Sequence, residues 1–264
     1  MPVKSNTLGL FIAHMDFEGI SPSTIQSIIS GIGFFHKLKD LDNPASSYLV
    51  KRAILGAKSK ARPPAQAAPI QIDLLLEICK LAEDLIVPSY DALLVKSMLL
   101  FAYHGCLRFG EIGNSGGTKH TIDIDQVKIG HDGTKGWVTF TMESFKNSKS
   151  PVKFRMNQTV QAKHCPVRAL TQYLGERGGV RGPLFIRKNG KAVSRDFFAK
   201  QIKFLVAKKG LDPDKYNTHS LRAGRATDLA IVGTPDAIIK ETGRWGSNAF
   251  YKYVRFNSFV LPEC

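Results

Sequence analysis

The sequence predicts a mainly α protein with a small antiparallel β-sheet, in the α+β class, divided into two domains. Apolar residues recur at helical spacing through most of the chain, and this spacing changes to alternation over residues 120–156. A Pro- and Ala-rich stretch without apolar periodicity, residues 61–69, separates a first helical part from the rest. We therefore expect a helical domain over residues 1–60, a linker over 61–69 and a mixed domain over 70–264.

Three helices are expected in the first domain. One covers residues 5–17, and a second begins after Ser21, a suitable N-cap, with Pro22 at its first position. The third begins near Ser46 and carries a set of basic side chains, Lys51, Arg52, Lys58 and Lys60. These side chains form either a solvated face or a surface that follows a DNA phosphate backbone.

The second domain begins with two largely apolar helices, over residues 70–86 and 89–105, and continues with three alternating segments that predict an antiparallel meander. A further helix, a hairpin turning at Asn189-Gly190 and a helix from about Ser194 to Lys209 come next. Three last helices are expected: one capped by Thr218 and running to about Val232, one starting at Thr234 and Pro235, and one over residues 247–255.

The charge balance points to a polyanionic partner. The chain has 37 Lys and Arg against 22 Asp and Glu, a net charge of +15 and a pI of about 9.7. This excess of positive charge favours a nucleic acid as the partner. The four cysteines lack C-x-x-C spacing and indicate a reducing compartment: Cys79, Cys106, Cys165 and Cys264. No apolar run is long enough to span a bilayer, so we expect a soluble intracellular protein without membrane contact.

Residues 219–255 combine side chains suited to phosphodiester chemistry. His219, Arg222, Trp245 and Tyr253 follow one another there, and Arg108 lies upstream in the segment HGCLRFGEI. Metal-free attack on a phosphodiester needs a nucleophile, positive donors for the non-bridging oxygens and an acid for the leaving oxygen. Guanidinium groups serve the second task best because they donate two parallel hydrogen bonds.

Several separated motifs carry a resemblance to a known family. H-x-x-R in THSLRAGRAT, G-R-W at residues 243–245, Y-V-R at residues 253–255 and C-L-R-F-G-E-I around Arg108 resemble the signature of the tyrosine recombinase (phage integrase) superfamily. The phrases S-P-S-T-I, F-F-H-K-L and C-P-V-x-A-L look most like recombinases of eukaryotic mobile elements of the Crypton and DIRS kind. The resemblance implies a helical core-binding domain followed by a tyrosine-recombinase catalytic domain.

The resemblance also implies roles for individual residues. Arg108 and Arg222 would clamp the scissile phosphate, and His219 would assist proton transfer or hold an oxygen. Lys146, in the second hairpin of the meander, would protonate the 5′ leaving oxygen, with Lys149 as the alternative. The nucleophile would be Tyr253, leaving a 3′-phosphotyrosine bond.

Other positions have supporting roles or alternatives. Glu111 resembles the acidic partner behind the first arginine, and either Trp245 or Arg244 fills the sixth position of the site. Tyr251 is the alternative nucleophile, and Arg225 is a candidate contact with the DNA backbone.

The expected function is therefore site-specific recombination of double-stranded DNA, for integration or excision of a mobile element, by four copies of the chain on two DNA sites. No metal and no cofactor are expected. The location would be the nucleus in a eukaryote and otherwise the cytoplasm or nucleoid. The alternatives are a catalytically silent DNA-binding protein of the same fold and a type IB topoisomerase.

Overall fold

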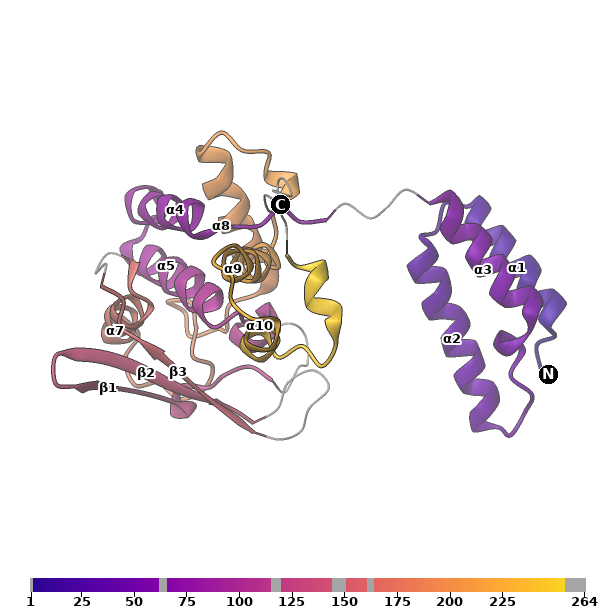
Figure 1. Cartoon of the computed structure of the whole chain (residues 1–264), viewed down its shortest axis with the longest axis horizontal. Coiled ribbons are helices and arrows are strands. Elements are labelled where there is room, and N and C mark those ends of the chain that lie inside the picture. Colours follow the sequence, from indigo (N-terminus) through magenta and orange to yellow (C-terminus); the bar gives the residue numbers. More distant parts are fainter. Residues whose placement is uncertain (1, 62–65, 115–119, 144–150, 161–163, 255–264) are drawn as a thin grey trace, which may run out of the picture. The chain divides into compact units, whose positions relative to one another are not determined.

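Two units of structure follow one another along the chain, residues 1–65 and residues 66–264. They are seen in a computed structural model (Figure 1), which describes residues 2–61, 66–114, 120–143, 151–160 and 164–254.

The predicted linker falls across this division. Within it, Ala68 already belongs to the second unit, because its backbone N–H donates to the carbonyl of Lys215 at 2.7 Å. Ile70 follows, and its N–H donates to the carbonyl of Ser220 at 2.9 Å. The backbone of the predicted linker is thus ordered by hydrogen bonds to the second unit from Ala68 onward.

The first unit contains the three expected helices, α1 (Ser5–Phe17), α2 (Pro22–Leu38) and α3 (Tyr48–Lys60). Ser21 caps α2 by accepting a hydrogen bond from the N–H of Thr24 at 3.2 Å. The third helix starts two residues later than expected, because Pro44–Ser46 form a separate 3₁₀ turn, η1, and Ser47 caps α3. The core of this unit consists of Leu8, Ile12, Met15, Ile25, Ile29, Val50 and Ala57.

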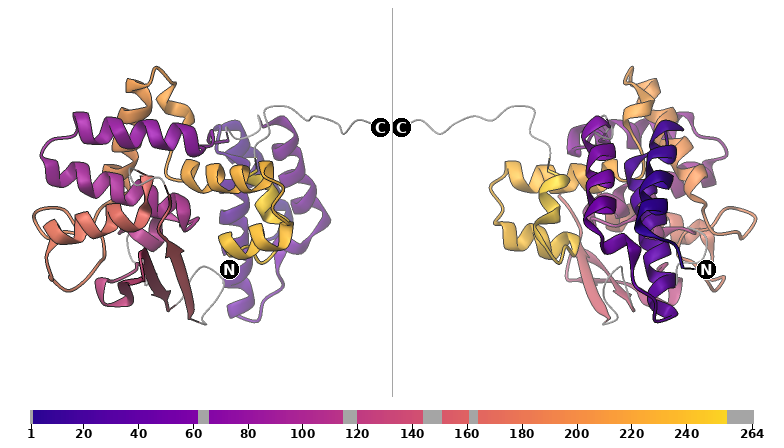
Figure 2. Two further views of the ribbon diagram at one scale, coloured as in Figure 1. Left: turned by 60° about the vertical axis from the view of Figure 1, so that its left-hand side comes forward. Right: turned by 90° about the vertical axis from the view of Figure 1, so that its right-hand side faces the viewer.

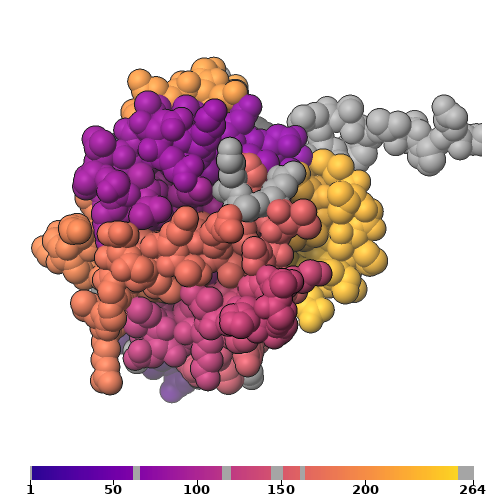
Figure 3. Space-filling model, turned by 90° about the vertical axis from the view of Figure 1, so that its left-hand side faces the viewer, coloured from indigo at the N-terminus to yellow at the C-terminus, as the bar shows by residue number. Residues whose placement is uncertain are grey.

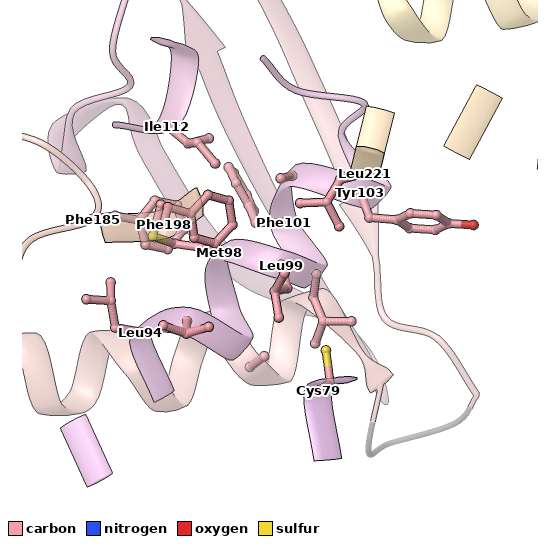
Figure 4. Packing of buried hydrophobic residues seen from close by; sticks show 14 of the residues in the cluster. Cys79, Leu94, Met98, Leu99, Phe101, Tyr103, Ile112, Phe185, Phe198 and Leu221 are labelled. Carbon is pink, nitrogen blue, oxygen red and sulfur yellow. The ribbon is translucent and has the colours of Figure 1, made fainter. Parts of the chain in front are cut away.

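The second unit is built around one buried helix, α5 (Ser89–His104). Its helices are α4 (Ile72–Leu85), α5 (Ser89–His104), α6 (Phe109–Ile112), α7 (Pro166–Arg177), α8 (Arg195–Lys208), α9 (Ser220–Ile231) and α10 (Asp236–Gly243). Helix α5 is buried along nearly all of its length and packs against α4, α7 and α9. Figure 4 shows apolar side chains of this core, where the ring of Phe101 lies 4.9 Å from that of Phe140 and 5.7 Å from that of Phe185.

The predicted meander is confirmed. Strands β1 (Val127–Asp132), β2 (Lys135–Met142) and β3 (Val152–Asn157) form an antiparallel sheet in the order β1-β2-β3 (Figure 1). Figure 2 shows the chain from two further sides. Phe140 in the middle strand lies opposite Val127 on one side and Phe154 on the other. Figure 3 shows the face on which α4, α7 and the sheet lie in successive bands.

The C-terminal part differs from its prediction at two points. Thr218 does not cap α9: the helix begins at Ser220, and the side chain of Asn217 instead accepts from the N–H of His219 at 2.8 Å. Asn is an equally good acceptor of such a bond and lies one residue earlier. After α10, residues Asn248–Lys252 form the 3₁₀ helix η5 rather than an α-helix.

Three cysteines, Cys79, Cys106 and Cys165, are free and buried. In the described part of the chain, no helix has both the length and the apolar character needed to cross a membrane.

Candidate active site

Arg108 and Glu111 form the first part of the site. After α5 the chain turns at Cys106, whose φ of 48° is in the left-handed region, and Arg108 occupies the N-cap of α6. The carboxylate of Glu111 accepts from the Arg108 backbone N–H at 2.8 Å and from its Nη1 at 3.1 Å. These two hydrogen bonds, both donated by Arg108, fix the direction of its side chain, which remains 23% exposed.

Arg244 shares the same carboxylate. Its Nη2 donates to Oε2 of Glu111 at 2.7 Å and to the carbonyl of Cys106 at 3.1 Å, and its Nη1 donates to the carbonyl of Gly105 at 3.2 Å. The side chains of Arg244 and Glu111 are each only 3% exposed. One buried carboxylate thus holds two guanidinium groups that come from distant parts of the chain.

Arg222 lies deeper in the protein. It is fully buried on α9, and its guanidinium donates to the carbonyls of Cys106 and Gly243. Burial, with a smaller contribution from the charges of Arg108 and Arg244, lowers the pKa of Arg222 to about 10. The group is therefore still protonated at neutral pH.

Two aromatic residues, Trp245 and Tyr253, cover Arg222, and we call them the aromatic cover. The Arg222 guanidinium carbon lies 4.1 Å from the Trp245 ring and 5.5 Å from the Tyr253 ring, and the two rings are 5.2 Å apart. Gly243 makes room for this arrangement, because a Cβ there would come within 1.7 Å of the Trp245 ring. Cation–π attraction favours this stacking where water is excluded.

The two candidate nucleophiles point to different partners. The hydroxyl of Tyr251 donates to the carboxylate of Asp236, and the residue is 54% exposed. This hydrogen bond raises the pKa of Tyr251. Tyr253 is half-buried on the Arg222 side, so its position fits the chemistry better.

His219 precedes α9 directly and is exposed as a residue. Partial burial of its imidazole lowers the pKa of His219, and the positive charges of Arg195, Arg222 and Arg108 add to this effect. Because the shift is downward from 6.5, the ring is mostly neutral at pH 7 and can accept a hydrogen bond.

An open cavity of about 980 Å³ joins several of these residues. Among its lining residues are four of the predicted site residues and two basic residues of β3: Arg108, Arg244, Trp245, Tyr253, Lys153 and Arg155. His219 and Arg222 do not line it. The sequence analysis did not single out Lys153 and Arg155, although the alternation in VKFRM places both on one face of a strand.

The remaining predicted residues are distributed over the two units. Lys146 and Lys149 lie outside the described residues. The basic residues of α3 are all exposed on the first unit: Lys51, Arg52, Lys58 and Lys60. Arg225 is half-buried, and its guanidinium carbon lies 5.6 Å from the ring of Tyr103. Within the described ranges, no three His, Cys, Asp or Glu residues cluster as metal ligands would.

The fold of the second unit is that of the tyrosine-recombinase catalytic domain. The model of the phage integrase family matches residues 69–254, and the chain belongs to that family. No curated protein matches the chain by sequence.

Solved structures of low sequence identity share the fold. The XerH recombinase bound to palindromic difH DNA after cleavage has a TM-score of 0.68 at 16% identity, over 95% of this chain and 68% of that one. A lambda integrase dimer bound to a COC′ core site has a TM-score of 0.62 at 15% identity, and the match covers 99% of this chain and 67% of that one. The Tn1549 transposon integrase in complex with circular intermediate DNA has a TM-score of 0.60 at 15% identity, and the match covers 97% of this chain and 82% of that one. In its pre-cleavage complex, XerH is matched over only 63% of its length.

Proposed function

We propose that this chain is a site-specific DNA recombinase that cleaves and rejoins strands through a 3′-phosphotyrosine intermediate. The observation that carries the proposal is the convergence of Arg108, Arg244 and Tyr253 on one cavity, with Arg222 directly behind Tyr253. The guanidinium groups supply positive charge where a phosphorane would develop negative charge. Membership of the phage integrase family supports the same reaction class.

In the proposed reaction, Oη of Tyr253 gives its proton to a base, for which the neutral His219 is the candidate, and forms a bond to phosphorus. The bond from phosphorus to the 5′ oxygen breaks. A lysine, Lys146 or its alternative Lys149, gives a proton to the leaving oxygen. The 5′ hydroxyl of a second strand then attacks the phosphotyrosine and restores the tyrosine. The number of phosphoester bonds is conserved, so no external energy source is required.

Arg222 needs a rearrangement before it can act. Its Nη1 and Nη2 each donate to a backbone carbonyl, and the guanidinium is buried under Trp245. A phosphate therefore reaches it only when the aromatic cover shifts. His219 lies three residues before Arg222 in the sequence. Because its ring is mostly neutral at pH 7, we propose that it accepts a proton during the reaction.

Finer parts of the proposal concern biological context. A role in moving a mobile element is supported by the motif phrases described above and by the likeness to a transposon integrase. Assembly as four protomers on two DNA sites is supported by the dimer of the lambda integrase neighbour on its core site. We propose a location where cellular DNA lies, the nucleus in a eukaryote or the nucleoid otherwise.

The test is covalent capture of DNA. The full chain is incubated with a pool of short duplexes that carry a randomised core and scattered nicks, and protein-bound DNA is recovered after denaturation and sequenced. We expect an adduct with the parent chain and with Tyr251→Phe, and none with Tyr253→Phe. An adduct of equal yield with Tyr253→Phe would show that Tyr253 is not the nucleophile.

A DNA-binding protein without cleavage is the second candidate, and the burial of Arg222 favours it. It predicts binding to the duplex pool, falling steeply with salt because phosphates are neutralised, with no adduct from any variant. Relaxation of supercoiled plasmids that lack a recovered sequence would instead indicate a topoisomerase.

A further inference from the structure

Asp228, on α9, receives hydrogen bonds from two other segments of the second unit. Its Oδ1 accepts from Nε2 of Gln71 at 2.9 Å, and its Oδ2 accepts from the backbone N–H of Ile72 at 2.8 Å. The hydroxyl of Tyr103 also donates to Oδ2. Hydrogen bonds to a carboxylate are stronger than those between neutral groups.

The donors come from two places that matter for the site. Gln71 and Ile72 lie where the chain enters α4, and Tyr103 lies in the last turn of α5. Three residues after Tyr103 is Cys106, whose carbonyl binds both Arg222 and Arg244. Figure 4 shows the hydroxyl of Tyr103 pointing away from the apolar core. Asp228 therefore joins the helix of Arg222 to the turn that leads to Arg108.

The segment that enters the second unit, residues 68–72, also follows α9 closely. The N–H of Ile70 donates to the carbonyl of Ser220 at 2.9 Å, at the start of α9. One turn further, Gly224 faces the same residue, and a Cβ at position 224 would lie 1.7 Å from the carbonyl oxygen of Ile70. Contacts at Ser220, Gly224 and Asp228 thus hold the entering segment along one side of the helix that carries Arg222.

We propose that Asp228 is a positioning residue for the cleavage reaction: its hydrogen bonds to Gln71, Ile72 and Tyr103 set the place of Arg222 relative to Cys106 and Arg108. Among the described residues, Asp228 makes no hydrogen bond to the proposed reacting groups Arg108, Arg222 and Tyr253, and it acts through the position of α9. The segment of residues 68–72 arrives from the first unit, so the same contacts make the geometry of the site depend on that segment. This inference rests on the proposed recombinase function.

Tyr103 supplies a donor throughout the working pH range. Burial, and then the hydrogen bond to Asp228, raises the pKa of Tyr103. The phenol therefore stays protonated, and Tyr103→Phe removes one hydrogen bond without removing a charge. This makes Tyr103→Phe a milder variant than Asp228→Asn, which removes the negative charge from all three donors.

The experiment compares Asp228→Asn and Tyr103→Phe with a matched control, Tyr173→Phe. Tyr173 is also fully buried, and its hydroxyl bonds to backbone groups of Leu184 and Ile186, accepting from the N–H of Ile186 at 2.9 Å. All variants are made in the full chain on a Trp137→Phe background. Because the chain has two tryptophans, the emission then comes from Trp245, which stacks on Arg222.

We measure the rate of adduct formation in a single turnover at saturating DNA, using a duplex recovered from the covalent-capture pool, together with affinity for that duplex, melting temperature and Trp245 emission. Asp228→Asn is expected to slow adduct formation roughly 10- to 100-fold, the loss typical of a small misplacement of reacting groups. Tyr103→Phe is expected to give a smaller loss in the same direction. DNA affinity stays at the parent value and Trp245 emission shifts, whereas Tyr173→Phe lowers only the melting temperature.

The positioning role is overturned if Asp228→Asn and Tyr103→Phe lower the melting temperature as Tyr173→Phe does, yet react at the parent rate with unchanged Trp245 emission. A parent chain that forms no adduct contradicts the proposed function instead. In that case the emission decides the positioning role alone: a shift in Asp228→Asn that is absent from Tyr173→Phe supports it, and no shift overturns it.

Discussion

Arg108 and Arg222 look alike in the sequence but occupy opposite situations in the fold. Arg108 projects from the N-cap of a four-residue helix, pairs with one carboxylate and lines an open cavity. Arg222 lies in the first turn of α9, donates to two backbone carbonyls and is covered by two aromatic rings. Arg108 is thus accessible from the cavity, whereas Arg222 is shielded from it by the aromatic cover.

The difference shows that two arginines of one site can be held in place by different kinds of interaction. Charge pairing with Glu111 orients Arg108 and leaves part of its side chain in solvent. Stacking and carbonyl contacts orient Arg222 and remove it from solvent, which costs solvation but excludes water around the charge. The predictions below test the two arrangements separately.

The largest effect is expected for Glu111→Gln. The substitution keeps the shape but removes the only carboxylate that pairs with both Arg108 and Arg244 in the described residues, and Arg244 is 3% exposed. An uncompensated buried charge should lower the free energy of unfolding by about 3–5 kcal/mol. Urea denaturation measures it. The control is Asp214→Asn, which removes a carboxylate that pairs with Lys203 at the surface. This variant should unfold at the same urea concentration as the parent. If Glu111→Gln also unfolded at the parent midpoint, the shared pairing would be contradicted.

Trp245→Ala should remove the cover from Arg222. Truncating this buried ring should lower the free energy of unfolding by about 3 kcal/mol. It should also expose the guanidinium to phenylglyoxal, so that mass spectrometry finds Arg222 labelled in the variant and protected in the parent, while Arg108 is labelled in both. Equal labelling of the two arginines in the parent chain would remove the contrast between them.

Two histidines with lowered pKa values, His104 and His219, give a pH test. Burial, and then the charge of Arg225, lowers the pKa of His104 from 6.5 to about 4. The unfolded chain therefore binds more protons between these pH values, so this contribution to stability is complete above pH 6.5 and is lost as pH falls toward 4. The loss should be on the order of 2 kcal/mol after allowance for partial exposure.

Melting temperatures at pH 7 and pH 5 measure this effect. His104→Gln should flatten the acid dependence more than His219→Gln, because His219 is exposed although its pKa also falls. If His219→Gln flattened the profile more, the histidine beside Arg222 would be the more strongly desolvated of the two.

The smallest effect is expected for Tyr251→Phe. Its hydroxyl binds Asp236 at the surface, away from Arg222, so stability and phenylglyoxal labelling of Arg222 should match the parent. Tyr253→Ala should raise the labelling of Arg222, because it removes one ring of the aromatic cover. Raised labelling in Tyr251→Phe alone would mean that the two tyrosines have exchanged roles.

Much of the fold could be predicted from the sequence because residues close together in the chain mark where its helices, strands and turns begin. Ser21 and Pro22 mark the start of α2, alternation marks the strands, and Asn189-Gly190 turns a hairpin in which the N–H of Arg187 bonds to the carbonyl of Lys191. The pairing of Arg108 with Glu111 is also local, since the two residues are three positions apart. The α+β class and the order of elements follow from such signals.

The rest of the site depends on contacts that leave no side-chain pattern. Cys106 and Gly243 bind Arg222 through their backbone carbonyls, which every residue possesses. Ile70 fits against Gly224 only because α4 and α9 meet in space. The catalytic roles assigned from motifs, including that of Lys146, therefore stay predictions, whereas the burial of Arg222 could not be anticipated from residue types at all.

Arg244 ends α10 in the left-handed conformation, at φ 56° and ψ 45°. Glycine is the usual residue there, and a larger side chain costs roughly 1 kcal/mol. The backbone N–H groups of Arg244 and Trp245 close the helix end by donating to the carbonyls of Glu241 and Lys240 at 3.0 and 2.9 Å. The bonds from the Arg244 guanidinium to Glu111 and Cys106 add to these local ones. The path of the chain into Trp245 and Tyr253 thus depends on the helix end itself and also on Glu111, 133 positions away. We therefore expect this last stretch to reach its final place only after α6 has formed.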